Sequence, residues 1–276
     1  METFRSRWAA GQRALWRLPR DRDWSVIILA VAFLLVLSIP WDWSGVLQWL
    51  AGMGRSQPFA AYESAIRAAA VKTPAAAMPV TRLDPEATET EVIKFGYVGT
   101  ADGKLAKGSQ LTGEIFVALP DELKRRCKGA SDPSTALQRV LGLPPTAGTK
   151  PAYLLKVPTN EIFRPCLSTD SVTTTICTAS PPGDIATVPA GDTKHKHFDF
   201  VAGLLMKSYH AGFTRDGAQG NDYPYDGYPF TGMGYTYDWG SSGNGHFGVS
   251  EFVVERGAII SDVTPVDLGS FCAATP

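Results

Sequence analysis

The sequence has no excess of charge of either sign. Its 276 residues contain 26 Lys and Arg against 27 Asp and Glu, which gives a net charge of -1 at pH 7. A domain that binds nucleic acid needs clustered positive charge to neutralise phosphates, so we expect no nucleic-acid partner. With 44% hydrophobic residues, the chain is also too apolar to be intrinsically disordered.

The sequence signatures of several enzyme classes are missing as well. The chain contains neither a phosphate-binding GxxxxGK[ST] loop nor a Rossmann glycine fingerprint, so no motif supports nucleotide chemistry. Ser250 lies outside any G-x-S-x-G nucleophile elbow, because Phe252 stands where the last glycine should be. The zinc motif H-E-x-x-H is absent too. These absences favour a binding protein over an enzyme and predict no cofactor.

One segment near the N-terminus is long and apolar. From Trp24 to Trp43 the only ionisable residue is Asp42. About 20 apolar helical residues cross the hydrocarbon layer of a bilayer. Trp24 at one end, and Trp41 with Trp43 at the other, are typical of interfacial aromatic belts. We therefore predict that residues 24–43 form a single transmembrane helix.

The flanks of this segment predict its orientation. Residues 1–23 contain six arginines and only three acids. Positive flanks stay in the cytoplasm, so the rest of the chain is expected on the periplasmic or extracellular side of the inner (plasma) membrane. A cleaved signal peptide is the alternative. However, the bulky sequence IPWDWSGVLQWL follows the apolar run, where a small-residue cleavage site would be expected.

The four cysteines all follow the predicted membrane span. An even number of cysteines on the exported side favours two disulfides. Of the three possible pairings, we favour a short loop between Cys166 and Cys177 and a long-range bond between Cys127 and Cys272, which would tie down the C-terminus. A metal site built from cysteines is the alternative, but the chain has no C-x-x-C spacing.

The predicted organisation has four parts: a basic cytoplasmic segment over 1–23, the anchor over 24–43, a membrane-proximal helix and Pro/Ala/Thr linker over 44–90, and an exported domain over 91–276. Apolar alternation in the exported part predicts strands at 91–99, 111–119, 152–158 and in the C-terminal third. Helices are expected at 134–143, capped by Ser134 and ended by Gly142, and at 197–212. The fold class is therefore α+β with a mainly antiparallel sheet.

The histidines are the first candidates for chemistry. His195 and His197 are two apart, so an extended chain would place both rings on one side. His210 lies at the other end of the predicted helix. Together the three could hold a metal ion, because catalytic zinc sites use three protein ligands and keep one open position. The alternative is a solvated KHKH segment in front of a helix.

The second candidate is a Tyr-rich stretch near the C-terminus, whose aromatic members are Tyr225, Tyr228, Tyr235, Tyr237 and Trp239. Aromatic faces beside carboxylates suit sugar rings, so this stretch is a candidate binding face. Filling of the core is the alternative for Tyr235, Tyr237 and Trp239. Asp238 and Glu251 flank one glycine-rich turn and are expected to face each other across a hairpin, as a pair of hydrolytic carboxyls would.

These observations predict a membrane-anchored envelope protein whose exported domain binds a partner protein or a cell-wall glycan. The alternative is an envelope hydrolase that acts through Asp238 and Glu251, or through a metal bound by the three histidines.

Overall fold

The computed structural model describes residues 57–70, 78–101, 103–145, 150–213, 227–241 and 245–273. They form an α+β domain with a mainly antiparallel sheet and two disulfides, as the sequence predicted. The predicted cytoplasmic segment and the anchor over 24–43 lie outside the described residues. None of the helices in these described ranges is long and apolar enough to span a bilayer. The anchor therefore stays a prediction.

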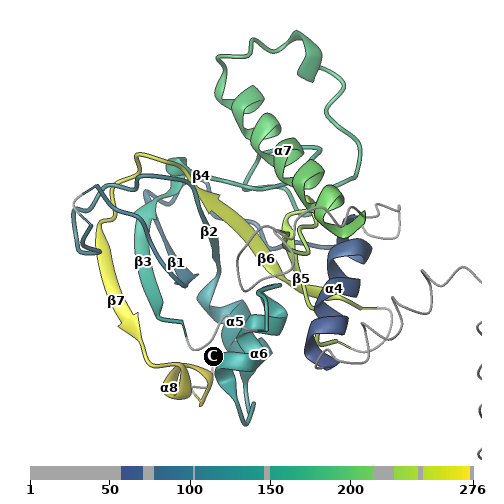
Figure 1. Ribbon diagram of the computed structural model, residues 1–276. Helices are drawn as coiled ribbons and strands as arrows, with labels where there is room; N and C mark the ends of the chain where they lie inside the picture. The colour runs from purple at the N-terminus through teal and green to yellow at the C-terminus, as the bar shows by residue number, and fades with distance from the viewer. Residues whose placement is uncertain are drawn as a thin grey trace, which may run out of the picture. The chain divides into compact units, whose positions relative to one another are not determined.

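A seven-stranded sheet is the centre of the domain (Figure 1), with strand order β4-β6-β2-β1-β3-β7 and β5 paired to β6. Every pair of neighbouring strands is antiparallel. The strands are β1 (Glu89–Phe95), β2 (Ile115–Ala118), β3 (Ala152–Pro158), β4 (Ile162–Phe163), β5 (Tyr235–Tyr237), β6 (Phe247–Val254) and β7 (Asp262–Val266). The prediction of β3 from apolar alternation is confirmed with its boundaries.

The helices are α4 (Gln57–Ala70), α5 (Pro120–Cys127), α6 (Pro133–Val140), α7 (Thr193–Phe213) and α8 (Leu268–Ala273), with short 3₁₀ turns at Thr159–Glu161 and Ile185–Thr187. The start of α6 corrects one prediction: Asp132, not Ser134, caps the helix, and its carboxylate accepts a hydrogen bond from the Thr135 N–H at 3.1 Å. Proline occupies the first turn of α6, where a missing N–H costs nothing. Gly142, with φ of +66°, follows the helix end as expected.

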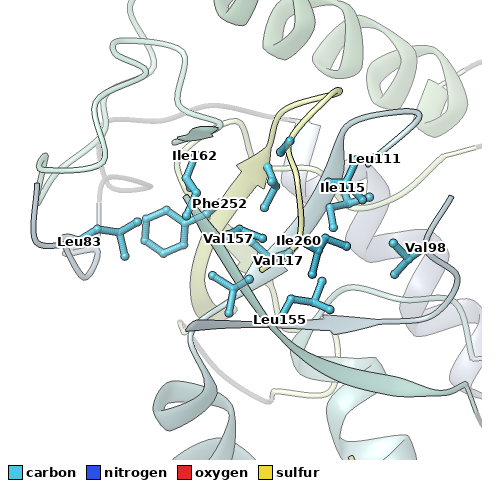
Figure 2. Packing of buried hydrophobic residues seen from close by; sticks show 13 residues of the cluster. Leu83, Val98, Leu111, Ile115, Val117, Leu155, Val157, Ile162, Phe252 and Ile260 are labelled. Carbon is cyan, nitrogen blue, oxygen red and sulfur yellow. The ribbon is translucent and has the colours of Figure 1, made fainter. Parts of the chain in front are cut away.

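One face of the sheet packs a continuous aliphatic core. Val92, Val117, Leu155 and Phe252 come from four neighbouring strands and are all less than 5% exposed. Figure 2 shows that loop residues such as Leu83 complete this core. Because these side chains alternate along their strands with residues of the opposite face, they leave the second face free for the helices.

Two separate apolar clusters cover that second face. In the first, Leu123 of α5 and Leu137 of α6 pack against Ile93 and Val249. The second is built around α7, whose Val201 packs against Val253. Val249 and Val253 lie on the same strand, β6, four residues apart. The residue midway between them on the same face is Glu251, so the two clusters leave a space at a carboxyl group.

Both disulfides have the pairing that the sequence favoured. Cys127 of α5 is bonded to Cys272 of α8 across a sequence separation of 145 residues, inside the first helical cluster. Cys166 is bonded to Cys177, 11 residues further along, and closes a loop that follows β4. The long-range bond fixes the C-terminal helix to the domain, and the short one fixes the loop.

The folded domain begins before residue 91. Val80 and Leu83 are buried, and their N–H groups donate to the carbonyls of Thr175 and Val172 at 2.8 and 2.9 Å. Helix α4 contacts α7, and the ring of its Tyr62 meets Trp239 edge-on at 5.9 Å. The compact unit therefore spans residues 55–276. The part of the predicted linker from Met78 onward is packed onto the domain.

The disulfides give the first testable prediction. A crosslink restricts the unfolded chain more when it closes a longer loop, so the paired change Cys127→Ala/Cys272→Ala should lower the free energy of unfolding by about 5 kcal/mol. The pair Cys166→Ala/Cys177→Ala should lower it by about 3 kcal/mol. Urea unfolding of the full-length protein, followed by circular dichroism, measures both. Equal losses, or a larger loss from the second pair, would contradict the prediction.

Candidate functional site

The space between the two helical clusters is a cavity of about 350 Å³. Its described walls come from the end of β1, from Lys150 just before β3, from β2, β5 and β6, from the turn after α6, and from α7 with the segment that begins at Gly227. Residues far apart in sequence thus line one space. A cavity of this size lies in the range that binds small molecules.

Glu251 is the only carboxyl group among the described residues that line the cavity. Ala118 lies opposite Glu251 on β2, and its methyl group leaves room above the sheet. Within the described chain, the Glu251 carboxyl has no hydrogen-bond or ion-pair partner. Burial raises the pKa of Glu251 to about 8, and the positive charge of Lys94 opposes this rise only in part. At pH 7 the carboxyl is therefore mostly protonated.

Three lysines share the cavity with Glu251: Lys94 of β1, Lys150 just before β3, and Lys207 of α7. Burial, followed by repulsion from Lys150, lowers the pKa of Lys94 to about 8. Lys207 is exposed and lies at the rim. At pH 7 the Glu251 carboxyl is mostly neutral and the Lys94 amine mostly cationic, so together these two described groups carry positive charge. Above pH 8 the cavity loses positive charge at Lys94 and gains negative charge at Glu251.

Aromatic rings form much of the remaining wall. Phe116 and Phe230 meet edge-on with centroids 5.9 Å apart. Tyr237 faces the same cavity and is held by stacking on the His246 ring, 4.7 Å away. Tyr97 and Tyr228 are 81% and 54% exposed, which places them at the rim. Aromatic walls therefore surround Glu251 and Lys94 inside the cavity, and the rim combines exposed rings with Lys207.

Asp238 and Glu251 do not face each other, which corrects the expected pair. Glu251 N–H bonds to the carbonyl of Gly234 at 2.9 Å, whereas Asp238 N–H bonds to the carbonyl of His246. The two acids thus lie at opposite ends of the β5–β6 ribbon. The Asp238 carboxylate is paired with Arg126 at 2.8 Å and accepts from the Gly240 N–H. Asp238 stabilises the turn and does not line the cavity.

The structure also separates the Tyr-rich set. Tyr235 and Trp239 are buried, and Trp239 donates its indole N–H to the carbonyl of Leu143 at 2.9 Å. Both residues fill the core. Tyr228 and Tyr237 line the cavity, and Tyr225 lies outside the described residues. The sequence left a core position and a binding face equally open for Tyr235 and Tyr237. The structure places Tyr235 in the core and Tyr237 at the cavity.

His195 and His197 each have partners within the fold. The Nδ1 atom of His195 lies 2.9 Å from the carbonyl of Val188. The two ring nitrogens of His197 each lie 3.0 Å from a carboxylate oxygen, one from Asp170 and one from Glu255. The hydrogen bond from His197 holds the pKa of Asp170 below its usual value. His197 therefore ties α7 to the loop and to the end of β6.

The metal hypothesis stays a prediction. His210 lies in α7, but its side chain is outside the described part of the structure. Among the side chains that the structure does describe, no group of three or more His, Cys, Asp or Glu is arranged so that it could hold a metal ion.

Sequence reasoning named Glu251 and Tyr237 but missed the three lysines. Lys94 belongs to an ordinary alternating strand, and Lys207 to the polar side of a helix. Neither position carries a motif. The lysines could have been found only by knowing which strand and helix ends meet.

The comparisons with known proteins add no assignment: no family model matches the chain, and no curated protein or solved structure is significantly similar to it.

The unusual state of Glu251 predicts a stability effect. Its pKa is about 8 in the folded protein against an ordinary value of 4.5, so between these values the folded state keeps a proton that the unfolded state releases. Folding stability therefore falls as the pH rises through this window. Glu251→Gln removes the ionisation and should stabilise the protein by about 1–3 kcal/mol at pH 8, but hardly at pH 4.5.

Urea unfolding at pH 4.5, 7 and 8 measures the effect, and Glu91→Gln, at an exposed glutamate of β1, is the matched control. A destabilised Glu251→Gln protein would show that Glu251 has a structural role, and the site would lose its main argument.

Proposed function

We propose that this protein is an envelope protein, anchored by residues 24–43, whose exported domain binds a small anionic molecule in the cavity around Glu251. The observation that carries the proposal is the set of ionisable groups that line the cavity. One carboxyl that has no hydrogen-bond or ion-pair partner among the described residues lines the cavity together with Lys94, Lys150 and Lys207.

The charges of the groups that line the cavity support this proposal. A buried carboxylate would cancel the attraction of the lysines for an anion, but the pKa of Glu251, raised to about 8, leaves it neutral at pH 7. The partly buried Lys94 then attracts an anion more strongly than it would in water, and the exposed Lys207 adds positive charge at the rim. An anionic ligand would also relieve the mutual repulsion of Lys94 and Lys150.

Export is supported by the two disulfides, because such bonds persist in oxidising compartments and are rare in the cytosol. A neutral glycan is a weaker candidate ligand than the sequence suggested, since Tyr235 and Trp239 are buried in the core. A glycan that carries phosphate or carboxylate groups still belongs to the proposed class. A partner protein remains a further prediction.

A hydrolase is the second candidate function, and one observation favours it. A carboxyl group with a pKa near 8 is protonated at neutral pH, so Glu251 could donate a proton to a leaving group as a general acid. Asp238 lies away from the cavity, so this reaction would use a single carboxyl.

Binding of simple anions tests the proposal. We expect inorganic pyrophosphate or ribose 5-phosphate to bind the full-length protein saturably in titration calorimetry at pH 7. Replacing Lys207 by Ala removes one charge from the rim and should weaken binding about tenfold.

Lys196→Ala is the matched control, because Lys196 is also exposed on α7 but does not line the cavity. Its affinity should equal that of the unchanged protein. If neither anion binds, or if both lysine variants weaken binding equally, the cavity is not an anion site.

A further inference from the structure

The interior and the rim of the cavity offer different chemistry. Inside, Glu251 lies between the apolar clusters, with Phe116, Phe230 and Tyr237 along the walls. At the rim lie Lys207, which is exposed, and the exposed rings of Tyr97 and Tyr228. A ligand that fits both regions has an uncharged flat part that enters first and an anionic part that stays outside.

The Glu251 carboxyl inside the cavity determines which flat chemical groups of a ligand can bind beside it. A protonated carboxyl carries one O–H donor beside one acceptor oxygen. Its complement is an edge on which a donor and an acceptor are adjacent, as on an amide or a nucleobase. Flat heterocycles also pack well against aromatic side chains, with ring centroids typically 4.5–7 Å apart. A sugar could satisfy the carboxyl but would make less use of the flat walls.

The rim suits phosphate. Lys150, just before β3, and Lys207 of α7 both line the cavity and belong to different parts of the fold, so each can supply positive charge to an anion bound there. Lysine binds phosphate as a point charge and needs no glycine-rich loop. A nucleotide site of this kind would leave no P-loop or Rossmann motif in the sequence.

We propose that the cavity binds a nucleotide, with the base inside against the Glu251 carboxyl and the phosphate at Lys150 and Lys207. This inference rests on the proposed function, because it names the class of the anionic ligand.

A ligand series at pH 7 separates the two proposals. The probes are the four ribonucleoside monophosphates, adenosine, ribose 5-phosphate and pyrophosphate, titrated into the full-length protein. At least one nucleotide should bind at least about tenfold more tightly than ribose 5-phosphate, since the base adds stacking and two hydrogen bonds. If ribose 5-phosphate binds as tightly as every nucleotide, the nucleotide inference fails and the anion site stands. If no anion binds, the proposed function fails as well.

Two variants of Glu251 test the role of the carboxyl. Glu251→Gln keeps an adjacent donor and acceptor without charge, so its affinity for the best nucleotide at pH 7 should stay within about threefold of the unchanged protein. Glu251→Leu keeps a similar volume but loses both groups and should bind at least about tenfold more weakly. Thermal unfolding confirms that both variants fold. A folded Glu251→Gln protein that no longer binds, or a Glu251→Leu protein that binds normally, would overturn the inference.

The pH profile gives a second readout. Among the described residues, the titratable groups that line the cavity with Glu251 are Lys94 from β1, Tyr97 after β1, Lys150 before β3, Lys207 from α7, Tyr228 before β5 and Tyr237 from β5. Nucleotide affinity of the unchanged protein should fall between pH 7 and 9, as Glu251 ionises and Lys94 loses its proton.

The Glu251→Gln protein still contains Lys94. Its nucleotide affinity should therefore also fall between pH 7 and 9, but by less than that of the unchanged protein. Superimposable profiles for the two proteins would show that Glu251 does not contact the ligand as a neutral acid.

Discussion

The buried guanidinium of Arg164 connects the segments on which the cavity depends. Arg164 is 0% exposed and donates hydrogen bonds to the carbonyls of Thr81, Val172 and Gly234, which belong to three separate segments. Its charged group also lies 4.3 Å from the ring of Phe252 on β6. Burial lowers the pKa of Arg164 only to about 10, so it stays charged at neutral pH. Without such partners a buried charge would be strongly unfavourable.

Strand β6 connects Arg164 to the cavity. The Gly234 carbonyl that accepts from Arg164 also accepts from the Glu251 N–H at 2.9 Å. The neighbouring Ser250 donates its N–H to the buried carboxylate of Glu122 at 2.7 Å. The backbone around Glu251 is therefore held from both sides by polar contacts, while its own carboxyl has no partner. An acid with a strongly raised pKa on a rigid strand is typical of residues kept for binding or catalysis.

The local sequence predicted most of the elements and both disulfide pairings. Apolar alternation found β1, β3 and β6, and a glycine followed by two prolines located the end of α6. The errors have local causes. Asp132 caps α6 because its carboxylate accepts a hydrogen bond from the Thr135 N–H. From sequence alone the nearby Ser134 is an equally plausible cap. The linker from Met78 looked extended and Pro-rich, but its few apolar side chains find buried positions.

The sequence by itself determined the fold class and the presence of an acid on a late strand, because these follow from periodicity along the chain. It favoured one of three possible cysteine pairings, and the structure shows that pairing. Only the tertiary structure decided which groups surround that acid. Both faces of β6 are covered, so alternation could not tell which residues lie against the helices and which lie against the other core. The meeting of Glu251 with Lys94, Lys150 and Lys207 depends on how strands and helices pack, and no short-range pattern records it.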